Sequence, residues 1–193
     1  NIILPDEDKS TIVVQTDLYR AVISNEGGGS VVGYALTEKD ADGVSKYRGT
    51  YANDGNYEPS QDVILIHGVL DDVCAPCLGT KSSNIKYNQP FKLLSQLNGD
   101  LEIRGDDKPF PLTYRLDLVN GDFIQKTMII DAKSFSIEST FNYSLTNTHG
   151  PKSLSGQDNV EILWTSGVFP SEPPISSSKS YSQDELNYSS VYA

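Results

Sequence analysis

The chain has 193 residues, of which 37% are apolar and 21% charged, and its formal net charge is −11. A chain of this length and composition can bury one sizeable core, and it is too apolar to be disordered throughout. The acidic balance argues against nucleic acid and anionic membrane surfaces as partners, because both are bound through clustered Lys and Arg. No apolar run approaches the roughly eighteen residues that a membrane span needs. Because the first residue is Asn1 rather than Met, we expect a piece of a longer protein.

The first segments favour β-strands. Residues 11–16 are rich in β-branched side chains, and residues 18–24 alternate in character, so both are predicted to be strands. Three consecutive glycines, 27–29, predict a turn, because glycine tolerates positive φ. A third strand is predicted over 31–36.

A long connection is predicted next. Residues 37–61 carry Asp, Gly, Asn, Tyr and Lys with no sustained period, which is typical of a surface loop. Short apolar runs at 63–66 and 91–94 and the alternation at 101–104 predict short strands.

The second half predicts three consecutive antiparallel strands. Residues 112–118 alternate, Asn120-Gly121 is a strong hairpin signal, and 123–131 is the returning strand, with Ile124, Lys126, Met128 and Ile130 on one face. Residues 135–146 place Phe135, Ile137, Phe141 and Tyr143 on one parity against polar partners, which indicates a half-buried strand. One more strand is predicted over 160–164.

These patterns define the fold class and the domain limits. No segment of about twelve residues shows helical periodicity, so we predict an all-β fold, an antiparallel sandwich or barrel with little helix. The domain is assigned to residues 1–170. Residues 171–193 are rich in Ser and Pro and are predicted to be extended.

The two cysteines form a C-x-x-C motif, Cys74 to Cys77. A redox motif should open a helix, which is not predicted here, and the acidic pair Asp71-Asp72 would raise a thiol pKa. A zinc site lacks a second ligand pair, and His67 as a third ligand is a weak proposal. A small disulfide-closed loop and two plain thiols both remain open, with the disulfide favoured in an oxidising compartment.

Other candidate sites are weaker. His67 and His149 are the only histidines, and the sequence does not bring them together for acid–base chemistry. Residues 40–43 hint at a calcium loop but lack its closing Glu. We therefore predict no enzyme: no catalytic residue, no cofactor-binding residue, no cofactor and no metal ligand.

The order of the strand segments resembles one family, the YidC-type membrane protein insertases of the Oxa/YidC/Alb superfamily, in their large periplasmic domain. The resemblance covers most of residues 11–170. Residues 37–88 are longer than the family's usual connection, so the resemblance implies a long loop or insertion there, which contains the C-x-x-C motif. The segments that carry it are the Thr16-Asp17 strand with its glycine turn and the strand at 31–36, Gln89–Leu94, the paired strands 112–118 and 123–128 with Lys126, the strand from Phe135, and Ile162–Gly167.

The resemblance implies a β-supersandwich of galactose-mutarotase-like architecture, located in the periplasm as part of a bacterial inner-membrane protein. It implies a non-catalytic role in membrane protein insertion and folding. The partners would be Sec translocon components and nascent membrane proteins, bound by a membrane-embedded parent protein. A periplasmic location would favour a Cys74–Cys77 disulfide.

Two other readings are compatible with an all-β domain. The first is a secreted carbohydrate-binding or carbohydrate-active sandwich, in which Tyr51, Tyr57 and Trp164 would stack on sugars. The second is an adhesin or assembly module whose open sheet edge pairs with a partner.

Overall fold

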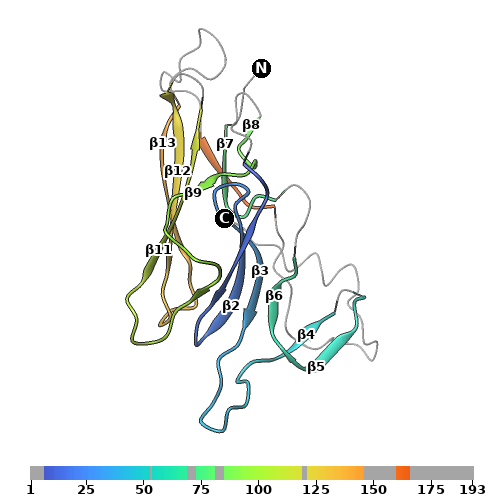
Figure 1. Cartoon of the computed structure of the whole chain (residues 1–193). Coiled ribbons are helices and arrows are strands. Elements are labelled where there is room, and N and C mark those ends of the chain that lie inside the picture. Colours follow the sequence, from blue (N-terminus) through green and yellow to red (C-terminus); the bar gives the residue numbers. More distant parts are fainter. Residues whose placement is uncertain are drawn as a thin grey trace.

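A computed structural model describes residues 7–52, 54–68, 73–80, 85–118, 121–145 and 160–165 (Figure 1). Its regular elements are all strands, so the predicted all-β class with antiparallel sheets is confirmed. Among these residues there is no helix long and apolar enough to cross a membrane. The strands are β1 Thr11–Gln15, β2 Tyr19–Ser24, β3 Ser30–Leu36, β4 Arg48–Tyr51, β5 Tyr57–Asp62, β6 Ile64–Ile66, β7 Cys77–Thr80, β8 Ile85–Lys86, β9 Lys92–Leu93, β10 Leu101–Glu102, β11 Phe110–Asp117, β12 Phe123–Ile130, β13 Glu138–Ser144 and β14 Val160–Leu163.

The first sheet has the order β10-β1-β2-β3-β6. Its neighbours are antiparallel except β1 and β10, which are parallel. The alternation predicted for β2 places Tyr19, Ala21 and Ile23 inward, and all three are fully buried. Strand pleating explains this, since successive side chains point to opposite faces.

The second sheet has the order β13-β12-β11-β9, and its centre is the predicted β11–β12 hairpin. Leu112, Tyr114 and Leu116 of β11 are fully buried, as are all four even-numbered residues of β12 from 124 to 130. The strand predicted over 135–146 is present as β13, but the apolar side chains on its predicted buried face are more exposed than expected. Phe135, just before the strand, is 40% exposed, and Tyr143 is 44% exposed. Because β13 is the last strand of its sheet, its apolar face lies at the rim of the core.

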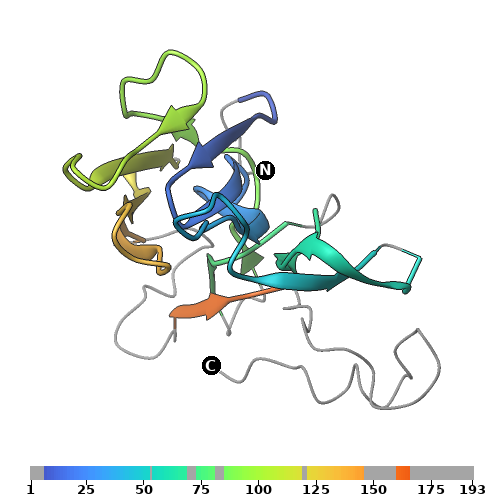
Figure 2. The same cartoon turned by 90° about the horizontal axis from the view of Figure 1, so that it is seen from below.

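The two sheets pack face to face around one apolar cluster. Figure 2 shows them edge-on as adjacent layers, with β11 and β12 in one and β1 to β3 in the other. The cluster takes Val14, Tyr19 and Ile23 from the first sheet and Tyr114, Ile124 and Met128 from the second, among others. The two layers approach closely at the glycine turn: a Cβ on Gly29 would lie 2.6 Å from Met128 Sδ, and one on Gly28 would lie 2.8 Å from the Phe91 ring.

Two smaller sheets complete the described fold. One has the order β14-β7-β8, and the other pairs β4 with β5. The predicted surface loop over 37–61 is therefore wrong in part, because β4 and β5 lie within it and Thr50 and Tyr51 are buried. These strands are short and largely polar, so hydrophobic periodicity does not mark them. The segment 171–193 lies outside the described residues.

Candidate functional site

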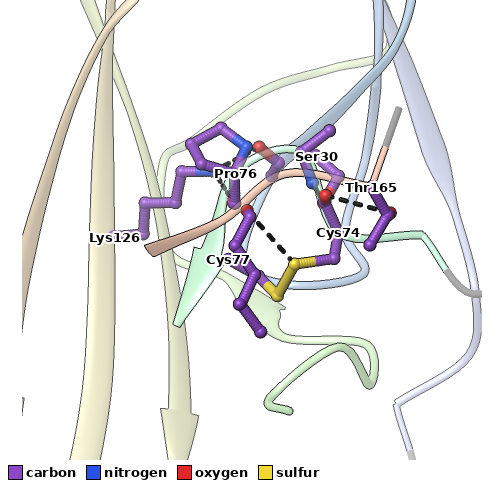
Figure 3. The surroundings of a disulfide bond; sticks show 9 residues. Ser30, Cys74, Pro76, Cys77, Lys126 and Thr165 are labelled. Carbon is purple, nitrogen blue, oxygen red and sulfur yellow. Dashed lines mark hydrogen bonds between the residues drawn. A yellow bond between two sulfur atoms is a disulfide. The ribbon is translucent and has the colours of Figure 1, made fainter. Parts of the chain in front are cut away.

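The Cys74–Cys77 loop lies between the sheets of the molecule, and Figure 3 shows its surroundings. The two sulfurs are bonded to each other as a disulfide. Cys74, Ala75 and Cys77 are fully buried. A Cβ on Gly27 would lie 2.7 Å from Cys77 Cβ, so the glycine turn packs directly against the disulfide.

The backbone carbonyls of Cys74, Ala75 and Pro76 each accept a hydrogen bond from a different part of the sheets. The carbonyl of Cys74 accepts from the backbone N–H of Thr165, just after β14, at 2.7 Å and from its hydroxyl at 3.1 Å. The carbonyl of Ala75 accepts from the N–H of Val31 in β3 at 2.7 Å, and the N–H of Ala75 donates to Ser30 Oγ at 3.0 Å. The loop thus ties the first sheet to β14.

The third carbonyl binds a buried lysine. Lys126 Nζ of β12 donates to the carbonyl of Pro76 at 2.7 Å and to the carbonyl of Gly29 at 2.6 Å. Its side chain is fully buried, and that burial lowers the pKa of Lys126 to about 7. A neutral amine has two N–H donors, which matches the two carbonyls that accept from it. We call Ser30, Cys74, Ala75, Pro76, Cys77, Lys126 and Thr165 the loop junction.

An apolar pocket of about 210 Å³ lies beside the loop junction. Trp164, which lines it just after β14, is 42% exposed, and Ile162 of β14 is 66% exposed. The pocket brings together side chains from β3, β6 and the β13 region next to the end of β14. Its lining residues are Val31, Tyr34, Ile66, Pro76, Ile137, Ser139 and Trp164.

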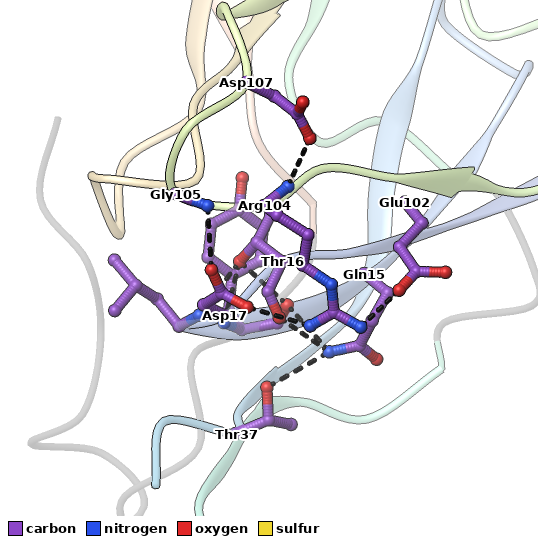
Figure 4. A network of polar contacts seen from close by, with 10 residues as sticks. Gln15, Thr16, Asp17, Thr37, Glu102, Arg104, Gly105 and Asp107 are labelled. Atoms are coloured by element: carbon purple, nitrogen blue, oxygen red, sulfur yellow. Dashed lines mark hydrogen bonds and ion pairs between the residues drawn. The ribbon is translucent and has the colours of Figure 1, made fainter.

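A polar network occupies the turn between β1 and β2 (Figure 4). Asp17 accepts hydrogen bonds from Arg104 Nη1 and from the N–H of Gly105, both at 2.8 Å. These two bonds, the Arg104 bond first, hold the pKa of Asp17 below its usual value. Arg104 also pairs with Glu102 of β10, so the network anchors the β1–β2 turn to the segment after β10. A polar groove of about 580 Å³, lined in part by Asp17 and Arg104, runs beside it.

The candidate site residues chosen from the sequence lie in separate parts of the structure or outside the described residues. His67 is partly buried, which lowers its pKa, whereas His149, Asp71 and Asp72 lie outside the described residues. Asp40 accepts the N–H groups of Asp42 and Val44, so residues 40–44 form a tight acidic turn. In the part of the chain that the structure describes, no group of three His, Cys, Asp or Glu side chains is placed to hold a metal ion.

The aromatic residues proposed to stack on sugars differ in their exposure to solvent. Tyr51 is only 3% exposed and packs on the Tyr57 ring at 5.1 Å, so it is not available on the surface. Trp164 keeps an exposed ring.

The residue that sequence reasoning missed is Lys126. Its position on the same parity as Ile124, Met128 and Ile130 was visible in the sequence and indicates an inward-facing charge. Its acceptors were not visible, because Gly29 and Pro76 belong to distant segments.

Comparison of the chain with protein-family models, with curated proteins and with solved structures finds no match in any of the three.

Proposed function

We propose that this chain is the periplasmic domain of a bacterial inner-membrane protein insertase of the YidC type, with a galactose-mutarotase-like sandwich. In this role it assists the insertion and folding of membrane proteins by contacting Sec components or substrate proteins, without catalysis of its own. One observation supports the proposal above the others. Several of the segments that carry the resemblance, although far apart in the chain, meet at one place in the fold.

That meeting place is the glycine turn. Lys126, from the second of the paired strands, donates to the carbonyl of Gly29. The ring of Phe91, from the Gln89–Leu94 segment, lies 2.8 Å from where a Cβ on Gly28 would be. Tyr114, from the first of the paired strands, lies against Gly29 in the same way. These contacts build the three segments into one apolar core, and a single sandwich core is what the resemblance implies for them.

The exposed end of β14 is the surface we assign to protein contact. Ile162 and Trp164 present apolar area to solvent next to the apolar pocket, and such continuous apolar surface is typical of interaction sites. β14 has a hydrogen-bonded neighbour, β7, on one side only within the described strands, so its outer edge is a place for an extended partner.

Site-specific photo-cross-linking in cells tests the proposal. A photoreactive amino acid is placed at Ile162 of the full-length gene product, and at Val44 as a control that is also exposed but lies in a different loop. We expect adducts with Sec subunits or nascent membrane proteins from position 162 and far fewer from position 44. Equal labelling of unrelated proteins at both positions would contradict the proposal.

A carbohydrate-binding sandwich is the second candidate, favoured by the exposed Trp164 ring beside a pocket that Tyr34 also lines. Aromatic faces commonly pack on sugar rings. Because Trp164 is the single tryptophan of the chain, its fluorescence reports binding directly. A saturable change in Trp164 fluorescence with one oligosaccharide would favour carbohydrate binding. No change in fluorescence across a panel of glycans would argue against it and favour the insertase role.

A further inference from the structure

We infer that the Cys74–Cys77 disulfide is a redox-controlled latch. While it is oxidised, it holds β14 and Trp164 of the apolar pocket against the sandwich, and it releases them when a dithiol reduces it. The inference concerns the loop junction alone and stands whether or not the domain serves an insertase.

The latch rests on the way three parts of the molecule meet at one four-residue loop. β3 is held through Ala75, β12 through Pro76 and the end of β14 through Cys74. Each bond is made to the backbone of the loop, so all three depend on the loop keeping one conformation. The disulfide restricts that conformation, because it links the two ends of the loop covalently.

β14 is the part most dependent on the latch. It is a four-residue strand that pairs with β7, which begins at Cys77, and the chain just after it is bonded through Thr165 to the Cys74 carbonyl. Of its apolar side chains, Val160 and Leu163 are only partly buried and Ile162 is exposed, so less apolar burial holds this strand than holds the central strands. The β11–β12 hairpin, in contrast, contributes fully buried residues along its whole length. Loss of the loop conformation should therefore free β14 and leave the main sandwich intact.

The chemical step is thiol–disulfide exchange with a dithiol. A thiolate of the reductant attacks one sulfur and breaks the Cys74–Cys77 bond, which gives a mixed disulfide and one free cysteine thiolate. The second thiol of the reductant then displaces the other cysteine. The two cysteines gain two electrons and two protons, and the reductant leaves as its own disulfide. Because both sulfurs are fully buried, exchange proceeds through local opening of the loop.

The chain contains its own reporter. Trp164 is the only tryptophan and adjoins Thr165, whose N–H binds the Cys74 carbonyl. The test uses the whole 193-residue chain, dithiothreitol as the dithiol, alkylation and mass measurement to count free thiols, and far-ultraviolet circular dichroism to follow the sheets. If the ring goes from 42% exposed to fully exposed, acrylamide quenching of Trp164 rises roughly two-fold.

We expect reduction to raise quenching by that factor, to leave the circular dichroism nearly unchanged and to be reversed on reoxidation. Hydrogen exchange of residues 160–165 should accelerate, while that of β11 and β12 should not. A Cys74→Ala/Cys77→Ala double variant should show the high quenching without reductant and no response to it. If this variant fails to fold, the reduction and reoxidation cycle of the natural chain still decides.

Three results would overturn the latch. The first is complete reduction with unchanged quenching and exchange. The second is loss of the whole β signal on reduction, which would make the disulfide a general staple of the fold. The third is a disulfide that dithiothreitol reduces only in denaturant, which would leave no route for release in the folded protein.

Discussion

Lys126 Nζ donates a 2.6 Å hydrogen bond to the backbone carbonyl of Gly29, which joins β12, a central strand of one sheet, to the β2–β3 turn of the other. The same nitrogen donates to the Pro76 carbonyl, so this one side chain connects the two sheets of the sandwich with the disulfide loop. A lysine in such a position is costly as a cation and well suited as a neutral amine.

The titration of Lys126 gives a pH prediction. Burial lowers its pKa from 10.5 to about 7 in the folded chain, so between these values the unfolded chain binds more protons. Stability should therefore rise with pH from about 7 to 9.5, by at most about 1.4 kcal/mol per pH unit, the slope for one proton. Urea unfolding at constant ionic strength measures it.

A Lys126→Met variant is the matched control for that rise. Methionine keeps the apolar stem and removes the titration, so its stability should change less with pH over the same window. Parallel curves for the two proteins would show that Lys126 has an ordinary pKa in the fold.

Gly29 should tolerate no side chain. Its φ is +101°, and an added Cβ would lie 2.6 Å from Met128 Sδ and 2.8 Å from the Tyr114 ring. Gly29→Ala is expected to destabilise the protein by about 2–4 kcal/mol, from overpacking added to backbone strain. Gly43→Ala is the control, because Gly43 also has positive φ but an added Cβ meets nothing within 4 Å. It should lose about 1 kcal/mol, the strain alone. Equal losses would mean that close packing at Gly29 contributes nothing.

The β4–β5 pair should open independently of the sandwich. It forms a two-stranded sheet of its own, and its buried Tyr51 lies outside the central apolar cluster. Isolated two-stranded sheets are marginally stable. Native-state hydrogen exchange should show the amides of β4 and β5 exchanging through small local openings and those of β11 and β12 only through global unfolding. Identical opening free energies in both regions would place β4 and β5 in the same cooperative unit.

The Asp17–Arg104 pair should matter at acid pH. The hydrogen bonds from Arg104 and Gly105 lower the pKa of Asp17, so the carboxylate contributes stability that is lost as pH falls below its ordinary value near 3.8. Asp17→Asn should cost little at neutral pH, because both side chains are about half exposed and surface pairs are screened. Its stability should approach that of the natural chain at pH 3. A gap that stays constant with pH would argue for a packing role instead.

The sequence predicted the strands whose side chains alternate and whose inward face is apolar. The hairpin signal at Asn120-Gly121 and the alternation of Leu112, Tyr114 and Leu116 correspond to the pair with the longest register in the fold. β4 and β5 escaped prediction because segments such as Tyr57–Asp62 hold together through backbone pairing and one pair of tyrosines, which leave no periodic pattern.

The candidate site was predictable only in part. The C-x-x-C spacing allowed a disulfide loop, and the parity of β12 turned Lys126 inward. Their meeting depends on which sheet faces which, and that arrangement is a property of tertiary packing that no local pattern encodes. β13 shows the same limit: its alternation is clean, yet its position at the sheet edge leaves Tyr143 exposed.

The most direct test of the proposed role is protease accessibility of the full-length gene product in intact bacterial cells and in spheroplasts, together with the hydropathy of the coding sequence on both sides of this chain. The account predicts a membrane-embedded protein with one apolar span before Asn1 and several after Ala193, whose domain is cut only once the outer membrane is opened. A product with a cleavable signal and no later apolar span, released without membrane association, would contradict it.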